Sequence, residues 1–121
     1  MTNDELKNRT KQFSLRILNL VEKLPNSISS RVIINQLAKS ATSVGANYRA
    51  VCRARSDKEF VAKLNIVLEE ADETQYWLEI IEEMKWINQS ELEFPLKEAD
   101  ELVAIFVTTL KTVNNRLNHK N

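Results

Sequence analysis

The chain has 121 residues with 17 basic and 17 acidic side chains, a length that favours one domain over residues 1–121. Hydrophobic residues make up 43% of it and charged residues 28%, which is typical of a globular protein and excludes the disordered and collagen-like classes. The one cysteine cannot form an internal disulfide, and the sequence shows neither a signal-peptide core nor an apolar run of membrane-spanning length. We therefore expect a cytoplasmic protein.

Residues that favour turns are scarce, because the chain has one glycine and two prolines. In four segments, apolar side chains recur at steps of three and four, which is the spacing of the buried face of an α-helix. The four stripes are Leu6, Phe13, Ile17, Leu20 and Leu24; Ile34, Leu37, Ala41, Val44, Tyr48 and Val51; Phe60, Leu64, Val67, Ala71, Leu78 and Ile81; and Leu92, Leu96, Ala99, Val103, Phe106, Leu110, Val113 and Leu117. The sequence predicts an all-α fold.

Capping motifs and prolines set the expected helix boundaries. Capping boxes of the form S/T-x-x-E mark the starts of the first, third and fourth helices: Thr2 with Glu5, Ser56 with Glu59, and Ser90 with Glu93. The second helix opens near Ser29 or Ser30, and Pro95 offers an alternative start for the fourth. The joints are short and lie near Pro25, Arg55 and Asn88. Short joints make neighbouring helices antiparallel, so we expect an antiparallel up-and-down four-helix bundle.

The last two helices carry more apolar side chains than one inward stripe requires. The additional residues are Val61, Ile66, Trp77 and Ile80 in the third helix and Leu102, Ile105 and Val107 in the fourth. A second apolar stripe often marks a subunit contact, so we expect a homo-oligomer. Trp77 and its neighbour Tyr76 are expected in the core or in a subunit contact, since no basic residue stands beside them.

Charge is distributed unevenly along the chain. Residues 27–55 hold five basic and no acidic side chains, whereas residues 56–89 hold nine acidic and three basic ones. At about 100° per residue, one outer face of the second predicted helix carries Lys39, Arg49 and Arg53 together with Thr42 and Ala46. This face lies opposite Val44 and Tyr48. Such a cluster attracts phosphate backbones, and the candidate nucleic-acid-binding residues are Lys39, Arg49, Arg53, Arg55 and Lys58. Alternatively, these cations pair with the acidic third helix across subunits and only hold a scaffold together.

Gly45 lies at the edge of this outer face, in the interior of the second predicted helix. A glycine there costs about 1 kcal/mol relative to alanine. A helix accepts that cost where something approaches its backbone closely. We expect a neighbouring helix, from this chain or from another subunit, and no ligand.

The sequence offers no candidate for catalysis or for a metal. His119, the only histidine, stands near the C-terminus of the sequence, so neither the Glu-x-x-His motifs of di-iron bundles nor a nucleophile–histidine pair is expected inside the bundle. Chemistry based on lysine or carboxylate groups stays open. One glycine cannot supply a phosphate-cradling loop, and Cys52 fits the role of a small apolar filler. We expect a non-enzymatic protein without a cofactor.

The segment from Leu37 to Ile81 resembles the four-helix bundle family of bacterial 23S rRNA intervening-sequence proteins. The elements that carry the resemblance are Ser40-Ala41-Thr42-Ser43, Ala46-Asn47, Arg55-Ser56, Phe60, Lys63-Leu64, Glu70-Ala71 and Tyr76-Trp77-Leu78-Glu79. Relatives often carry proline at the position of Gly45. The resemblance implies a homopentamer with a basic, funnel-like pore and contact with nucleic acid. Among the relatives is the accessory variability protein of diversity-generating retroelements, which binds nucleic acid and a reverse transcriptase.

These observations predict a non-enzymatic homo-oligomeric four-helix bundle, with a pentamer favoured by the resemblance. It would bind RNA or DNA through phosphate contacts and without base-specific readout. The alternative is a protein–protein interaction scaffold with no nucleic-acid role. Further copies of the chain, nucleic acid and a protein are thus the expected partners, and a membrane is not.

Overall fold

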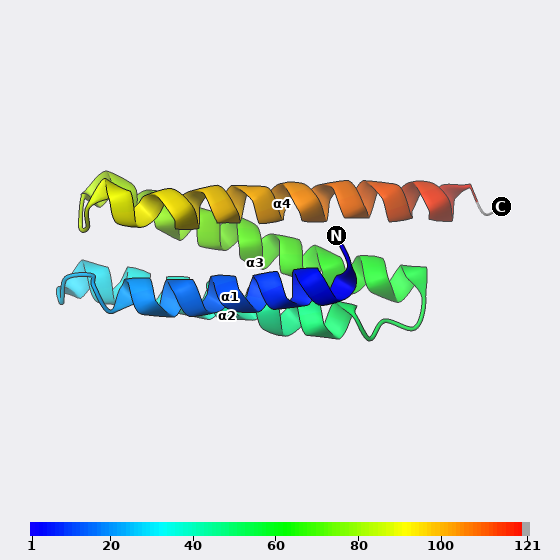
Figure 1. Cartoon of the computed structure of the whole chain (residues 1–121), viewed down its shortest axis with the longest axis horizontal. Coiled ribbons are helices and arrows are strands. Elements are labelled where there is room, and N and C mark those ends of the chain that lie inside the picture. Colours follow the sequence, from blue (N-terminus) through cyan, green and yellow to red (C-terminus); the bar gives the residue numbers. More distant parts are fainter. Residues whose placement is uncertain (120–121) are drawn as a thin grey trace.

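A computed structural model describes residues 1–119 and contains four α-helices and, within that range, no strand. The helices are α1 (Asn3–Val21), α2 (Ile28–Val51), α3 (Asp57–Met84) and α4 (Gln89–Asn118). They lie along one long axis, and the colours of Figure 1 show the chain turning back at each connection. The predicted all-α fold with four helices is confirmed.

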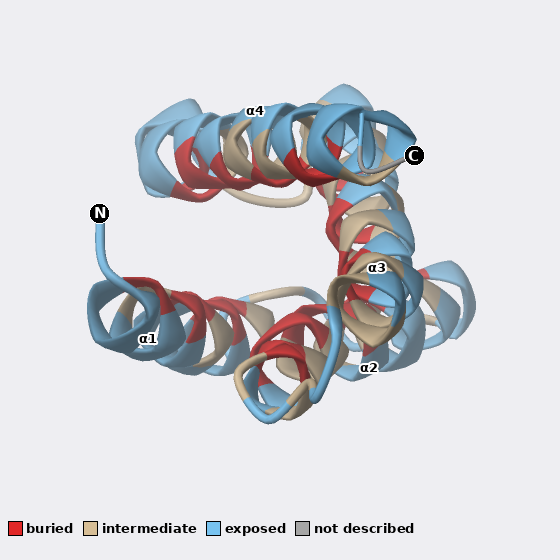
Figure 2. Cartoon of the chain, turned by 90° about the vertical axis from the view of Figure 1, so that its right-hand side faces the viewer, coloured by how far each residue is buried: buried red, intermediate tan, exposed pale blue. Residues whose placement is uncertain are grey.

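The helices pack in chain order around a common interior. Helix α2 packs closely against both α1 and α3, and α3 packs against α4, whereas α1 and α4 approach each other much less. Figure 2 shows the buried residues turned toward the interior and α1 and α4 at the two ends of the arrangement. One side of the bundle is therefore more open than the other three.

Two of the three predicted N-cap residues, Thr2 and Ser56, do cap their helices. The hydroxyls of Thr2 and Ser56 each accept the backbone N–H three residues ahead, at 3.1 Å. Helix α2 starts earlier than expected, because Ser27 forms a reciprocal capping box with Ser30. The prediction of a start at Ser90 or Pro95 was wrong. Helix α4 begins at Gln89 after an N-cap that makes no side-chain hydrogen bond, and Pro95 lies inside it.

The predicted apolar stripes form the core, with residues at the helix ends only half-buried. One assignment was wrong, because Leu102 lies in the core with no exposed surface, whereas Val103 from the predicted stripe is half-buried. Both residues fit the period, since they follow the buried Ala99 by three and four positions. Hydrogen bonds join the neighbours as well: Thr74 donates to Ser40 across α2 and α3 at 2.9 Å.

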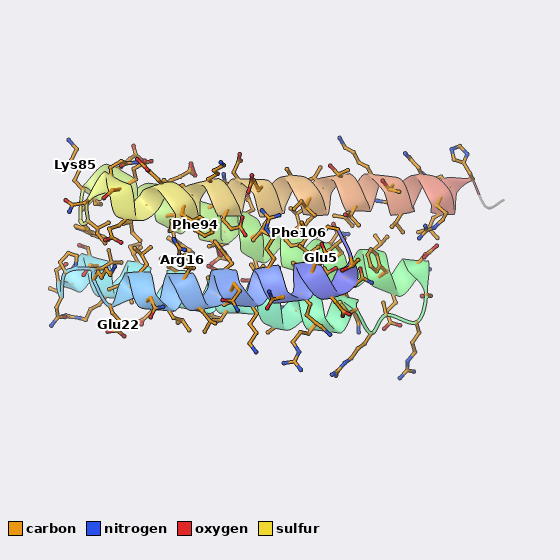
Figure 3. The ribbon with its side chains drawn as sticks, in the orientation of Figure 1. Glu5, Arg16, Glu22, Lys85, Phe94 and Phe106 are labelled. Carbon is orange, nitrogen blue, oxygen red and sulfur yellow. The ribbon has the colours of Figure 1, made fainter. Side chains whose placement is uncertain are left out.

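Charged side chains bridge the α1–α4 seam. Arg9 donates two hydrogen bonds to Glu98, at 2.7 and 2.6 Å, and a third to Glu101 at 2.8 Å. The Arg16 guanidinium lies 4.0 Å from the centre of the Phe94 ring, and Figure 3 shows the two side chains facing each other across the seam. These contacts join α1 to α4 on the open side of the bundle, in addition to the buried apolar stripe of α1.

Candidate nucleic-acid interface

All five predicted binding residues, Lys39, Arg49, Arg53, Arg55 and Lys58, are exposed. Within residues 1–119, none of their side chains forms an ion pair or a hydrogen bond. The charge of Lys39 acts on Glu70 of α3 and lowers the pKa of that carboxyl, against the stronger effect of burial. In this chain by itself, Arg49 of α2, and Arg53 and Arg55 in the loop that follows it, are thus not paired with the acidic α3.

At Gly45, α1 packs closely against the backbone of α2. A Cβ atom at this position would lie 3.2 Å from the Oγ atom of Ser14 and 3.3 Å from the carbonyl oxygen of Thr10. Ser14 also donates a hydrogen bond to the carbonyl of Ala41 at 2.9 Å, which links the two helix backbones. The neighbouring helix expected at this glycine is therefore α1 of the same chain.

Beside this contact, α1 and α2 border a groove of about 560 Å³, the α1–α2 groove. Its α1 wall is formed by Asp4, Lys7, Asn8, Lys11 and Ser14, and its α2 wall by Thr42, Gly45, Ala46 and Arg49. Lys7 lies 3.8 Å from Asp4, whose side chain is almost fully exposed, so water screens this pair. The groove therefore has cations on both of its walls.

A second hollow of about 420 Å³ adjoins the groove and is lined by Ala46, Arg49, Ala50, Arg53 and Lys63. Ala46 and Arg49 line both hollows, so the two adjoin. Lys63 is partly engaged, since it pairs with Glu59 at 3.1 Å. We call the cations Lys7, Lys11, Arg49, Arg53 and Lys63 the basic face. It extends over three helices.

Sequence reasoning found Arg49 and Arg53 of this face and missed the lysines of α1. Lys39, Arg55 and Lys58 line neither hollow. Lys7 and Lys11 are four residues apart, exposed and outside the buried stripe of α1. Their spacing predicts that the two lysines share one face of α1. Only the packing of α1 on α2 places that face beside Arg49.

Four of the nine acidic residues of α3 are exposed, and the other five are half-buried. Glu69, Asp72, Glu79 and Glu83 are exposed. Burial and the neighbouring charge of Glu73 raise the pKa of Glu70, although Lys39 acts in the opposite direction. Trp77 is half-buried and donates to Glu73 at 3.1 Å, whereas Tyr76 is 55% exposed and so lies outside the core of this chain. A place for Tyr76 in a subunit contact stays a prediction.

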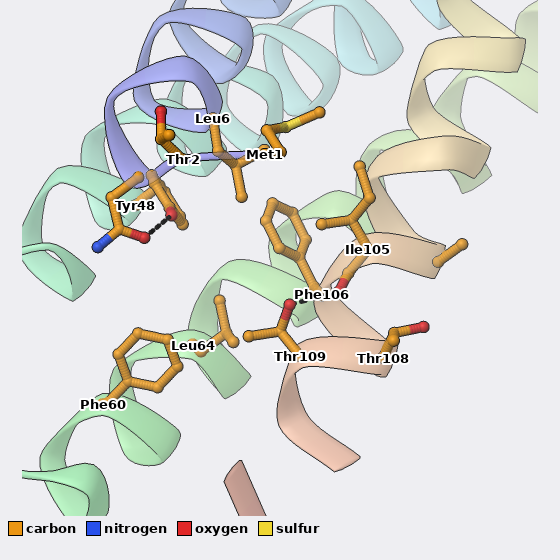
Figure 4. Close-up of a pocket in the computed structure, with 12 residues that line it drawn as sticks. Met1, Thr2, Leu6, Tyr48, Phe60, Leu64, Ile105, Phe106, Thr108 and Thr109 are labelled. Atoms are coloured by element: carbon orange, nitrogen blue, oxygen red, sulfur yellow. Dashed lines mark hydrogen bonds between the residues drawn. The ribbon is translucent and has the colours of Figure 1, made fainter. Parts of the chain in front are cut away.

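Another hollow, of about 460 Å³, lies at the end of the bundle where the N-terminal end of α1 meets α4 (Figure 4). Its lining includes Leu6, Leu64 and Phe106 together with the hydroxyl of Tyr48, which donates to the side chain of Asn3 at 3.3 Å. Burial raises the pKa of Tyr48. The lining side chains are thus apolar, hydroxyl or amide groups.

Within residues 1–119, no group of three or more histidine, cysteine, aspartate or glutamate side chains is placed to hold a metal ion. No helix in this range has the length and hydropathy needed to cross a bilayer.

Comparison with known proteins decides the family. The sequence matches the family model described as 23S rRNA-intervening sequence protein over residues 3–108. The chain belongs to this family. A solved structure from Bacteroides thetaiotaomicron, described as a protein with unknown function from the S23 ribosomal protein family, is similar in fold, with a TM-score of 0.82. The two sequences are 34% identical over 92% of this chain and 99% of the other.

A comparison with curated protein sequences gives no match. The family match confirms the resemblance seen in residues 37–81 of the sequence and extends it over α1 and over α4 as far as residue 108.

Proposed function

We propose that this chain is a non-enzymatic, antiparallel up-and-down four-helix bundle that assembles as a cytoplasmic homo-oligomer, with a pentamer favoured by family resemblance. The assembly binds RNA or DNA through phosphate contacts and reads no bases. The observation that carries the proposal is that Arg49 and Arg53 are exposed, line adjoining hollows and lack an acidic partner within residues 1–119.

Phosphate contacts are the chemistry that this arrangement supports best. Guanidinium groups bind phosphate oxygens through paired hydrogen bonds, and each neutralised phosphate releases counterions. Neither hollow of the basic face is lined by an aromatic side chain on which a base would stack. Affinity should therefore depend on salt more than on sequence.

Binding of a labelled oligonucleotide across a series of salt concentrations tests the proposal. The logarithm of the binding constant should fall steeply and linearly with the logarithm of the salt concentration. Replacing both Arg49 and Arg53 by alanine should reduce that slope by about 1.4 to 1.8, which is two phosphate contacts. A wild-type protein that binds no oligonucleotide even at low salt would show the proposal to be wrong.

The alternative is an interaction scaffold, and it is favoured by the exposed acidic residues of α3. Glu69, Asp72, Glu79 and Glu83 form no ion pair within the described chain and could meet the basic face of another subunit. Contacts of that kind weaken as salt screens them. If the protein is such a scaffold, its native mass should fall at high salt and in the Arg49→Ala variant, because subunits are lost. If the arginines instead serve nucleic acid, the native mass should stay the same in both cases.

A further inference from the structure

The α1–α2 groove brings together cations that lie far apart in the sequence. Lys7 and Lys11 stand on its α1 wall and Arg49 on its α2 wall. Lys11 has no ion-pair partner within residues 1–119, and the Asp4 partner of Lys7 is 94% exposed. An anionic chain lying along the groove would be met by cations from both sides.

Short side chains between those cations leave the groove open. Thr42, Gly45 and Ala46 line its α2 wall, and Ser14 turns its hydroxyl to backbone carbonyls of Thr10 and Ala41. Ala46 is exposed at the point where the groove continues into the second hollow, beside Arg53 and Lys63. The two adjoining hollows therefore form a path with cations along it from α1 to α3.

The width of this path favours one strand over two. Packed helices lie about 8–10 Å apart axis to axis, so the groove between them accepts a single extended chain but not a double helix. A duplex would rest on the rims and present one of its backbones to one row of cations, whereas a single strand in the groove is contacted from both walls.

We propose that the α1–α2 groove holds the phosphodiester backbone of single-stranded nucleic acid, with Lys7 and Lys11 as binding residues opposite Arg49. This inference rests on the proposed nucleic-acid binding and specifies its site and the form of nucleic acid bound.

Fluorescence anisotropy with labelled oligothymidylate, and with a duplex of the same length, tests the site. Lys7→Ala combined with Lys11→Ala should lower the affinity for the single strand roughly tenfold at low salt and reduce the salt slope by about 1.4. The matched control replaces Lys97 and Lys111 by alanine, since both are exposed lysines of α4 that line neither hollow. The control should bind as the wild type does.

A second variant blocks the path without removing a cation. Ala46→Glu places a carboxylate where the two hollows join, and it should weaken single-strand binding at least tenfold. Ala62→Glu is its control, because Ala62 is also exposed on a helix but lines neither hollow. Circular dichroism and the urea midpoint confirm that each variant is folded.

The results separate this inference from the function on which it rests. If Arg49→Ala with Arg53→Ala abolishes binding but the Lys7 and Lys11 substitutions do not reduce it, the groove proposal is wrong and nucleic-acid binding stands. Duplex binding as tight as single-strand binding also overturns the groove proposal. If the wild type binds neither oligonucleotide, both are wrong.

Discussion

Arg9 and Glu98 are the residues on which the α1–α4 seam depends most. The Glu98 side chain is 9% exposed and accepts two hydrogen bonds from a guanidinium that is 25% exposed. These hydrogen bonds, together with the charges of Glu98 and Glu101, raise the pKa of Arg9 although its partial burial acts against them. Arg9 therefore stays charged, and it needs a carboxylate beside it.

Replacing Glu98 by glutamine should destabilise the fold by about 2 kcal/mol, because a half-buried cation then loses its charged, two-point partner. Urea unfolding at neutral pH measures this loss. Glu101→Gln is the matched control, since that side chain is 48% exposed and accepts one bond, and its cost should stay below about 1 kcal/mol. Equal effects of the two substitutions would contradict a special role for Glu98.

Glu70 should make stability depend on pH in the opposite sense to a paired carboxylate. Its pKa is raised above the ordinary value of 4.5 by burial and by the charges of Glu73 and Glu69, against the effect of Lys39. The folded state thus binds this proton more tightly than the unfolded chain does. Ionisation costs stability, and that cost grows as the pH rises from 4.5 through the raised pKa.

Glu70→Gln should therefore raise the urea midpoint at neutral pH and lose this advantage below pH 4.5. The gain should be less than about 1 kcal/mol, because the carboxylate is largely solvated. Glu93→Gln makes the same change at an exposed position of α4 and should show no such pH dependence. A loss of stability in Glu70→Gln at neutral pH would mean that the attraction to Lys39 outweighs the other contributions.

At the scale of the helices, the caps of α3 and α4 give a direct comparison. Ser56 accepts the backbone N–H of Glu59 at 3.1 Å, whereas Ser90 lies inside α4 and caps nothing. Ser56→Ala should cost about 1 kcal/mol of unfolding free energy. Ser90→Ala should change it by less than about 0.5 kcal/mol. A cost at Ser90 similar to that at Ser56 would show that α4 starts later than Gln89.

The same two serines show where sequence reasoning about helices succeeds and fails. Periodicity and N-caps are local, so the four helices and the caps at Thr2 and Ser56 followed from the residues alone. The start of α4 did not, because Ser90-Glu93 fits the capping pattern equally well inside a helix. The choice between Leu102 and Val103 for the core likewise depends on the rotation of α4 against α3, which a local pattern leaves open.

The candidate site was predictable to the extent that it lies on one helix. Arg49 follows from the outer face of α2, whereas Arg53, which the same spacing placed on that helix, lies in the turn just after it. The contribution of Lys7 and Lys11 depends on α1 packing close to Gly45, a tertiary contact between residues more than thirty positions apart. A glycine in a helix predicts a close neighbour but does not say which helix that neighbour is.

For the whole molecule, the arrangement of the four helices gives unequal stability. Helix α3 packs closely against both α2 and α4, whereas α1 packs closely against α2 and lies much farther from α4, although its apolar stripe is part of the common core. Arg9, Arg16 over Phe94, and an exposed pair between Lys23, just after α1, and Glu91 at 3.1 Å also join this part of the chain to α4. A segment packed closely against fewer neighbours opens at lower free energy than the global unfolding.

Hydrogen exchange followed by mass spectrometry should therefore find faster exchange in the middle of α1 than in the middle of α3. The Glu98→Gln variant should accelerate exchange in α1 further while leaving α3 nearly unchanged, because the lost contact belongs only to the α1–α4 seam. Raising the salt concentration to about 1 M shortens the screening length to about 3 Å. Because salt then weakens the exposed ion pairs, it should also accelerate exchange in α1. Equal protection of α1 and α3 in the wild type would contradict an open seam in solution. It would mean that another copy of the chain covers α1, and the groove beside Lys7 and Lys11 would then lie within an interface.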